Sequence, residues 1–322
     1  MKYSVLIRTL GTAKDKYLQT LRACASQTIQ PQKVYVALPV GYKTPKETLG
    51  IETFIYTPKG MVAQRAFAFE QIENVDWVLL LDDDVTFPSD FVEKLGIVAS
   101  TENADVIVPS TSQQGHSVLK SVLIDFYNVL TLTRTKMFFE KEYLAKITAW
   151  GGYKIKSHVD RNKNYKTQTG IGICGLCKLC ALKASEFKDD LWLDKYGYAL
   201  PEDQVMYYKM YLRGYKLIAS PSNTFVHLDA RTGHVSDKDR REKEKKSIRL
   251  SCRNFTIFWY LYVWKYKVGL GKFWSLISFL FKMFVSCLNN LVICLLKRNL
   301  SCSFAAIYGY KQAFQEIKDE VI

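Results

Sequence analysis

The first part of the chain alternates short apolar runs with segments whose apolar residues recur at helical spacing. The runs expected to be strands are Ser4–Ile7, Lys33–Leu38, Thr53–Tyr56, Trp77–Leu81 and Asp105–Pro109. The segments expected to be helices are Tyr17–Ala25, Met61–Ile72 and Pro88–Val98. The run Trp77–Leu81 (WVLLL) is continuously apolar, which is typical of a strand covered on both faces. This alternation predicts an α/β fold built on a mostly parallel sheet flanked by helices.

Beyond residue 110 the pattern predicts a less regular series of elements. They are a helix over residues 117–147, a mobile basic loop over residues 150–169, an apolar segment with β character at Gly170–Leu182, a helix at Pro201–Arg213, and short strands at Lys216–Ala219 and Thr224–His227. The helix at Pro201–Arg213 is clearly delimited, because a proline begins it and Gly214 follows it. These elements are expected to complete one α/β domain over residues 1–230.

The composition changes after Asp229. A charged stretch at Lys238–Arg249 is followed by two strongly apolar stretches, Phe255–Trp264 and Phe273–Leu296. Of the net charge of +14, residues 231–322 carry +10, from 17 basic and 7 acidic residues. A basic tail favours nucleic acid, an anionic membrane surface or an acidic lipid-linked substrate. Because the tail is also the most apolar part of the chain, we expect a membrane surface and no nucleic acid. Residues 231–322 are therefore expected to form a basic, aromatic-rich helical region associated with a membrane.

The apolar stretch Phe273–Leu296 has 24 residues, enough to cross a bilayer as a helix. Lys282 and Asn289 interrupt it, and basic residues flank both ends, so it carries no orientation bias. An interfacial or re-entrant pair of helices is preferred, with a transmembrane span and a soluble helical cap as alternatives. The N-terminus leads straight into a strand-like run, so no signal peptide is expected. The expected location is the cytoplasmic face of the inner (plasma) membrane.

The chain has eight cysteines, which are expected to be free thiols in a reducing compartment. Cys174, Cys177 and Cys180 have a spacing that could hold a metal ion or cluster. They offer only three sulfurs, and no fourth cysteine or histidine lies near them at ligand spacing. Because they also lie in an apolar run, they are expected to pack as small buried hydrophobic residues.

Three consecutive carboxylates, Asp82, Asp83 and Asp84, follow the most buried-looking strand. Such a cluster repels itself, which raises its pKa values unless a cation is bound. Mg²⁺ or Mn²⁺ prefers oxygen ligands and bridges to substrate phosphates. The sequence therefore predicts a divalent metal site here, and the alternative is a solvated acidic turn that caps the helix at Pro88.

Two further segments contain side chains that could take part in catalysis. Glu202 and Asp203 begin a predicted helix, where acidic residues also serve simply to complement the helix dipole. His227 ends a β run, where a lone histidine is often structural. Taken with the Asp82–Asp84 cluster, these residues provide a metal site, a general base and a further metal ligand. That combination is what a metal-dependent transferase acting on nucleotide sugars needs.

Several stretches resemble, in order, the family 2 glycosyltransferases of the GT-A fold. The matching stretches are Ala25–Thr28 with Pro31, Lys33–Val36, Val62–Arg65, Leu81–Asp84 (the family's DxD motif), Gly170–Leu182, Pro201–Asp203 (its ED motif), Arg213–Lys216 and Val226–Leu228. The resemblance covers about residues 3–230. Arg253-Asn254 and the aromatic tail resemble the membrane-associated members that build polysaccharides on lipid carriers.

The resemblance implies a metal-dependent inverting transfer from a nucleotide-diphosphate sugar to a hydroxyl of a glycan or a polyprenyl-linked acceptor. By analogy Asp84, Asp82 and His227 are the metal ligands for Mg²⁺ or Mn²⁺. Asp203 is the general base, with Glu202 as the alternative. The residues assigned to donor binding are Arg8, Gln64, Arg65, Asp82 and Asp83.

One stretch departs from the family pattern. After the second strand the family usually has an acidic residue that contacts the nucleotide base, but this chain has Ala37–Gly41 there. The identity of the nucleotide is therefore left open. A nucleotidyltransferase is a second candidate, although Arg8–Thr12 contains only one glycine for cradling a triphosphate. A non-catalytic membrane-surface binding protein that kept the fold is a third.

Overall fold

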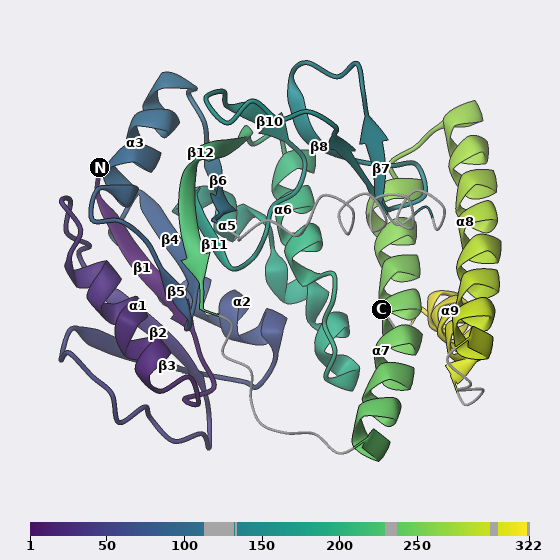
Figure 1. The fold of residues 1–322 in the computed structure, drawn as a ribbon, viewed down its shortest axis with the longest axis horizontal. Coiled ribbons are helices and arrows are strands. Elements are labelled where there is room, and N and C mark those ends of the chain that lie inside the picture. The colour runs from purple at the N-terminus through teal and green to yellow at the C-terminus, as the bar shows by residue number, and fades with distance from the viewer. Residues whose placement is uncertain (113–131, 133, 229–236, 297–301, 321–322) are drawn as a thin grey trace.

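In a computed structural model, which describes residues 1–112, 132, 134–228, 237–296 and 302–320, a twelve-stranded sheet runs through the first two thirds of the chain (Figure 1). The strands are β1 (Tyr3–Arg8), β2 (Val34–Pro39), β3 (Glu52–Thr57), β4 (Trp77–Asp82), β5 (Val85–Thr86), β6 (Val106–Thr111), β7 (Arg134–Met137), β8 (Tyr143–Ile147), β9 (Tyr153–Lys156), β10 (Tyr165–Thr167), β11 (Cys174–Lys178) and β12 (Leu217–His227). The helices are α1 (Asp15–Ala25), α2 (Met61–Gln71), α3 (Phe91–Thr101), α5 (Leu179–Ala184), α6 (Glu202–Leu212), α7 (Asp237–Phe258), α8 (Gly269–Leu296) and α9 (Ala305–Lys318), with a 3-10 segment η1 (Phe187–Tyr196) and a π-helical segment η2 (Trp259–Trp264).

The strand order is β3-β2-β1-β4-β11-β6-β12-β10-β8-β9-β7, and β5 pairs with β12. Strands β1 to β4 are mutually parallel, whereas β11 lies antiparallel between β4 and β6. The predicted α/β fold, a mostly parallel mixed sheet flanked by helices with a C-terminal helical extension, is confirmed. In the register of β1 and β4, Arg8 lies beside Asp82. The carboxyl ends of the parallel strands thus bring these side chains to one edge, where ligands bind in open α/β sheets.

Two predicted elements are wrong. The helix predicted over 117–147 is replaced, from residue 134 onward, by β7 and β8, and residues 117–131 and 133 lie outside the described residues. The loop predicted over 150–169 contains β9 and β10. These strands are short and rich in lysine and tyrosine, as suits the outer part of a sheet where lysine side chains reach solvent. Their polarity therefore resembled that of a loop.

The two short strands predicted at 216–227 form one strand. β12 runs through Pro221 with a shift of register between Ser220 and Thr224 in its pairing with β6. A proline fits such an irregularity because it cannot donate a ladder hydrogen bond. The segment Gly170–Leu182 divides into β11 and the start of α5, and the helix predicted at Pro201–Arg213 is confirmed as α6.

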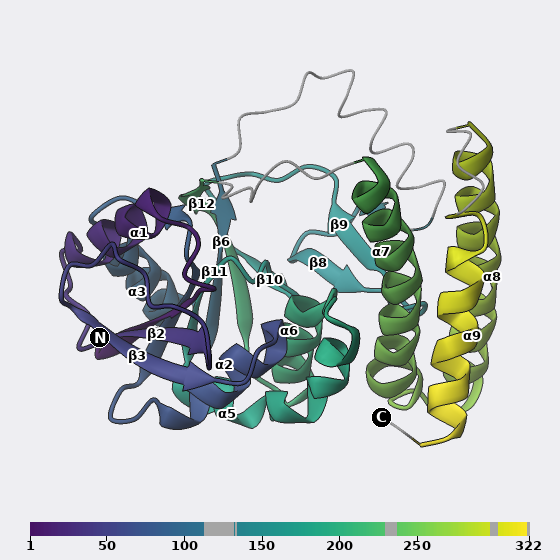
Figure 2. The same ribbon diagram turned by 90° about the horizontal axis from the view of Figure 1, so that it is seen from below.

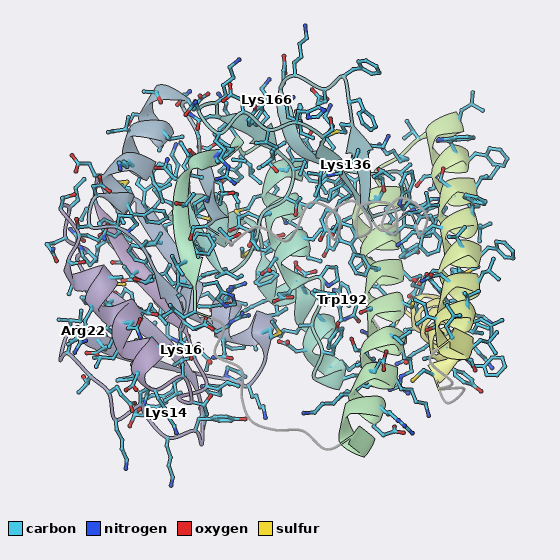
Figure 3. The ribbon with its side chains drawn as sticks, in the orientation of Figure 1. Lys14, Lys16, Arg22, Lys136, Lys166 and Trp192 are labelled. Atoms are coloured by element: carbon cyan, nitrogen blue, oxygen red, sulfur yellow. The ribbon has the colours of Figure 1, made fainter. Side chains whose placement is uncertain are left out.

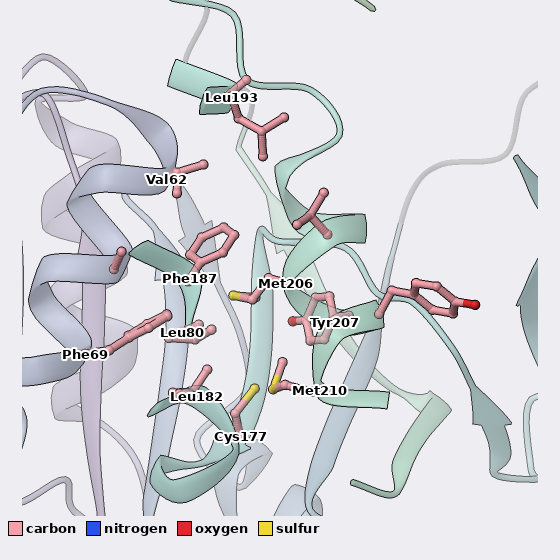
Figure 4. Packing of buried hydrophobic residues seen from close by; sticks show 14 of the residues in the cluster. Val62, Phe69, Leu80, Cys177, Leu182, Phe187, Leu193, Met206, Tyr207 and Met210 are labelled. Atoms are coloured by element: carbon pink, nitrogen blue, oxygen red, sulfur yellow. The ribbon is translucent and has the colours of Figure 1, made fainter. Parts of the chain in front are cut away.

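The sheet is covered by two hydrophobic clusters. Figure 4 shows the one on the side of α2 and α6, where Phe69, Leu80, Cys177 and Met206 meet. Cys174 and Cys177 are buried as predicted, whereas Cys180 is exposed. All eight cysteines lie within the described residues, and none forms a disulfide.

The C-terminal helices share this core with the sheet. Ile257, Phe258 and Trp259 belong to the same cluster as Phe69 and Met206. Helix α7 lies between α6 and the pair α8–α9 in both views (Figures 1 and 2). A chain without these helices would therefore expose part of the core of residues 1–230.

Buried polar contacts fix α7 against η1 and the segment that leads into α6. Arg253, fully buried, donates to both carboxylate oxygens of Glu316 on α9, at 3.0 and 2.5 Å, and to the carbonyl oxygen of Trp192 at 3.1 Å. Trp192, labelled in Figure 3, is a residue of η1, and its ring lies against Arg253 of α7. The Asn254 amide donates to the carbonyl oxygens of Tyr198 and Leu200, each at 2.9 Å. Residues 192–200 are thus held by the tail, and they lead directly to Glu202 and Asp203.

Candidate active site

A cavity of about 540 Å³ opens at the carboxyl edge of the parallel strands. Its walls are the ends of β1, β4 and β12, the start of α2, and the residues around the end of η1. The lining residues are Arg8, Thr9, Leu10, Thr12, Ala13, Lys59, Gly60, Met61, Gln64, Asp82, Asp83, Asp84, Asp194, Gly197, Tyr198, Ala199 and His227. A larger cavity is lined by residues of α7 and α9, and the predicted catalytic residues Glu202 and Asp203 line neither cavity.

Asp82 is the centre of an ion-pair network. Its Oδ1 accepts hydrogen bonds from Arg8 at 2.9 Å and from Arg65 at 3.3 Å. Arg65 is completely buried and also donates to the carbonyl oxygen of Gly172. Arg8 lines the cavity, whereas Arg65 does not. Arg65, which the sequence assigned to donor binding, therefore lies behind the cavity wall. There it holds the carboxylates of Asp82 and Asp203 in position.

The side chain of Asp83 is half-buried and lines the cavity. Its Oδ2 accepts a hydrogen bond of 2.5 Å from the hydroxyl of Thr9. Burial, reinforced by the charges of Asp84 and Asp82, raises the pKa of Asp83 to about 6, although the bond from Thr9 opposes the shift. Gln64 donates to the carbonyl oxygens of Thr9 and Ala37, each at 2.9 Å. Gln64 thus ties α2 to the ends of β1 and β2 and shapes the cavity wall.

Asp84 and His227 meet through strand pairing between distant segments. β5 pairs antiparallel with β12, which sets His227 opposite Val85. Nε2 of His227 lies 3.0 Å from Oδ1 of Asp84. The amide of Leu228 donates to the carbonyl oxygen of Asp84 at 2.8 Å, and Lys16 of α1, labelled in Figure 3, donates to the carbonyl oxygen of Leu228 at 2.7 Å.

These two side chains fit a hard divalent ion. Mg²⁺ is commonly held by one or two protein carboxylates, and substrate phosphates and water complete its shell. Asp84 and His227 present an oxygen and a nitrogen side by side at the cavity. Within the described parts of the chain, no group of three or more histidine, cysteine, aspartate or glutamate side chains could hold a metal by itself. The remaining ligands would have to come from water or from the oxygens of a bound molecule.

Glu202 and Asp203 lie at the start of α6. Arg65 donates to Oδ1 of Asp203 at 2.8 Å, and a guanidinium nitrogen of Arg8 lies 3.6 Å from Oε1 of Glu202. Each arginine therefore bridges Asp82 and one member of this pair. The side chain of Asp203 is 29% exposed and that of Glu202 only 4%. Burial, and then the charge of Asp203, raises the pKa of Glu202 to about 7. Asp203 is the more accessible of the two to a substrate.

Asp194 is a cavity residue that the sequence did not reveal. Its carboxylate accepts the first backbone N–H groups of α2, from Met61 and Ala63 at 2.8 Å and from Val62 at 3.1 Å. A β-carbon on Gly60 would lie only 2.1 Å from Oδ2 of Asp194. The glycine before α2 was the only local signal, because the capping carboxylate comes from a distant segment.

Replacing Asp194 with alanine should destabilise the fold by about 1–2 kcal/mol, because the first turn of α2 loses its cap. Urea unfolding measures the effect, and Asp189→Ala, at an exposed position of η1, is the matched control. If both variants unfold at the same urea concentration, the cap that Asp194 gives to α2 does not stabilise the fold.

Comparisons with known proteins give only distant structural similarity. No protein-family model matches the chain, and no curated protein matches it. Among solved structures, the chain is similar to GalNAc-T7 with UDP, GalNAc and Mn²⁺, at 12% identity and a TM-score of 0.47, over 81% of this chain and 49% of that one. It is also similar to S. aureus TarS 1–349, at 14% identity and a TM-score of 0.44, over 99% of this chain and 92% of that one. This chain thus spans about half the length of the GalNAc-T7 chain. At TM-scores below 0.5 we draw no functional conclusion from either.

Proposed function

We propose that this chain is a metal-dependent inverting glycosyltransferase. It would move a sugar from a nucleotide-diphosphate donor to a hydroxyl group of a glycan or polyprenyl-linked acceptor, in the synthesis of a cell-surface polysaccharide. The proposal rests on one observation: three separate segments of the chain meet at one edge of the sheet around Arg8 and Arg65. They are Asp82–Asp84, Glu202-Asp203 and His227. The resemblance of the same segments to family 2 glycosyltransferases agrees with it.

The cavity suits the donor. Its volume of about 540 Å³ lies in the usual range for small-molecule sites. Asp84 and His227 would hold Mg²⁺ or Mn²⁺, and the bound ion would neutralise charge on the departing nucleoside diphosphate. Asp82 keeps the guanidinium of Arg8 at the cavity wall through their 2.9 Å hydrogen bond, where its remaining N–H groups can meet the diphosphate.

Asp203 is the proposed general base. It would take the proton from the acceptor hydroxyl as the acceptor oxygen forms its bond to the anomeric carbon and the bond to the leaving phosphate oxygen breaks on the opposite face. Arg65 fixes the carboxylate through its bond to Oδ1, which leaves the other oxygen available to the acceptor. Glu202 is the alternative base, and its low exposure makes it the less accessible one.

Helix α8 supports the proposed membrane location. This helix has 28 residues. Its most apolar stretch has a mean hydropathy of 2.0, and only 17% of that stretch is buried. Its exposed large apolar side chains include Phe273, Trp274, Ile277, Leu280, Phe281, Phe284 and Leu288. We propose that α8 binds the cytoplasmic face of the inner membrane, as a peripheral or re-entrant helix. Cosedimentation with lipid vesicles tests this, and a full chain that stays in the supernatant at low salt would contradict it.

Two other functions have less support. A nucleotidyltransferase would need a glycine-rich loop after β1 to cradle a triphosphate, and only Gly11 is available there. A non-catalytic binding protein would have no use for the buried charges around Asp82, which are costly to keep unless they serve a site.

A thermal-shift screen with UDP, GDP, dTDP and CMP, each with and without Mn²⁺, tests the proposed function. A ligand at a hundredfold excess over its Kd stabilises a protein by about 2.7 kcal/mol. We expect one nucleotide to stabilise the chain, and to do so more strongly with Mn²⁺. No stabilisation by any nucleotide would contradict a nucleotide-sugar enzyme.

Replacing Asp84 with asparagine should abolish the Mn²⁺-dependent part of this stabilisation, because a charged ligand is lost while the hydrogen bond to the Asp84 carbonyl remains. Asp76→Asn, an exposed carboxylate beside the opposite end of β4, is the matched control. A variant at Asp84 that responds to nucleotide and Mn²⁺ like the wild type would show that the metal assignment is wrong.

A further inference from the structure

A basic groove lies between α7 and α9, with a volume of about 1240 Å³. Its basic side chains are Lys243, Lys245, Lys246 and Arg249 of α7 and Lys311 of α9. On α7, positions 242, 245, 246 and 249 share one helix face, since residues three and four apart are neighbours. Three of these positions, Lys245, Lys246 and Arg249, are basic and one, Glu242, is acidic, so this face of α7 presents a net positive charge to the groove.

The groove has an excess of positive charge, with five basic side chains and two carboxylates, Glu242 and Glu316. Of its two carboxylates, Glu316 already binds Arg253, and Gln312 and Lys195 also contact it. Although burial opposes the shift, the hydrogen bonds from Arg253 and Gln312 hold the pKa of Glu316 at about 2. Among the described residues, the ion pairs of Glu316 are with Arg253 and Lys195, and none of the five basic side chains of the groove is among these partners. Like charges gathered in this way favour a bound anion.

The groove is connected to the donor cavity through a short segment of chain. Gly197, Tyr198 and Ala199 line the donor cavity, while the preceding Tyr196 lines the groove. Nζ of Lys246 lies 3.8 Å from the place that a β-carbon on Gly197 would occupy. Ser247 of α7 forms a 2.9 Å hydrogen bond with the hydroxyl of Tyr198. A ligand in the groove would therefore lie next to the wall of the donor cavity.

We propose that this groove binds phosphate groups carried by the acceptor. An acceptor that contains phosphodiester or diphosphate groups would lie along α7 and pass its hydroxyl end over residues 196–199 toward the donor. This inference rests on the proposed function and names the substrate class of that site. Charge complementarity favours phosphate, and proximity to the donor cavity favours the acceptor over lipid headgroups. The apolar surface that we propose faces a bilayer belongs to α8. Helix α9 also exposes Ile307, Tyr308 and Phe314, of which only Tyr308 lines the groove.

The test uses the full chain and fluorescently labelled short inorganic polyphosphate, without nucleotide. We compare the triple variant Lys246→Ala/Arg249→Ala/Lys311→Ala with a control of equal charge change, Lys2→Ala/Lys94→Ala/Lys183→Ala, whose side chains are exposed elsewhere. Fluorescence anisotropy should show binding about tenfold or more weaker in the groove variant, and nearly unchanged in the control. Circular dichroism confirms that both variants are folded. Equal loss of binding in the two variants would overturn the proposal.

A second arm separates the acceptor from lipid headgroups. The same variants are tested with vesicles of phosphatidylglycerol and with vesicles of phosphatidylcholine. If the groove variant loses phosphatidylglycerol binding but keeps polyphosphate binding, the groove serves headgroups and the proposal is wrong. Because the probe is measured without nucleotide, a wild-type chain that binds nucleotide but not polyphosphate would refute the groove and leave the proposed function intact.

Discussion

Replacing Asp203 with asparagine should lower the rate of sugar transfer by about a hundredfold or more, the scale of a lost general base. Asparagine can still accept the hydrogen bond from Arg65 through its amide oxygen, so the start of α6 should keep its place. Donor affinity should barely change, because the base acts on the acceptor. Release of nucleoside diphosphate in the presence of acceptor measures the rate, and the nucleotide thermal shift measures donor binding.

The matched variant is Glu202→Gln, which alters the neighbouring carboxylate. Full transfer in Asp203→Asn, together with loss in Glu202→Gln, would move the role of base to Glu202. In that case transfer should rise with pH through about 7, because burial raises the pKa of Glu202 to about 7 and only the deprotonated form accepts a proton. The free energy of unfolding should change in the opposite direction. Because the pKa of Glu202 is raised in the folded state, folding favours its protonated form, and the stability gained from this is lost as the pH rises from about 4.5 through 7.

Replacing Arg253 with alanine should destabilise the fold by about 3–5 kcal/mol, because it leaves the buried carboxylate of Glu316 without its main partner. It also frees the carbonyl of Trp192, so residues 192–200 should loosen at the cavity wall and nucleotide binding should weaken. Urea unfolding measures the first effect and the nucleotide thermal shift the second.

Lys195→Ala is the control for this prediction. Lys195 also contacts Glu316, at 3.4 Å, but its side chain is more exposed, so its loss should cost less than about 1 kcal/mol. The double variant Arg253→Met/Glu316→Met, which removes both charges, should recover most of the stability. If Arg253→Ala unfolds like Lys195→Ala, the tail does not hold the cavity wall through this pair.

The fold and the acidic cluster could be predicted because their signals are local. A continuous apolar run such as WVLLL indicates a buried strand, and the carboxylates that follow it must then lie at the carboxyl end of that strand. Pro201 and Gly214 delimit α6 in the same way. β8 to β10 could not be predicted, because short lysine-rich strands at the outer part of a sheet have the composition of loops.

The side-chain contacts within the site could not be predicted from the local sequence, because they join segments that are far apart in the chain. The pairing of Asp84 with His227 depends on β5 and β12 lying together, and the cap that Asp194 gives to α2 comes from a distant segment. Arg65 resembles a residue that faces the donor, yet the structure buries it between Asp82 and Asp203. The tail was predicted from its charge and apolar runs, but its packing into the core depends on buried contacts such as Arg253–Glu316, which a composition does not contain.

The most direct measurement of the central claim follows the anomeric proton by NMR while the full chain, with diamagnetic Mg²⁺, acts on a sugar linked to the nucleotide that binds. An inverting glycosyltransferase should cleave the nucleotide sugar and give a first-formed product, with acceptor or with water, whose anomeric configuration is opposite to that of the donor. The Asp84→Asn variant should give none above background. A first product of retained configuration would contradict a single displacement by the acceptor oxygen with Asp203 as its general base, and no cleavage of any nucleotide sugar would contradict the assignment of the cavity.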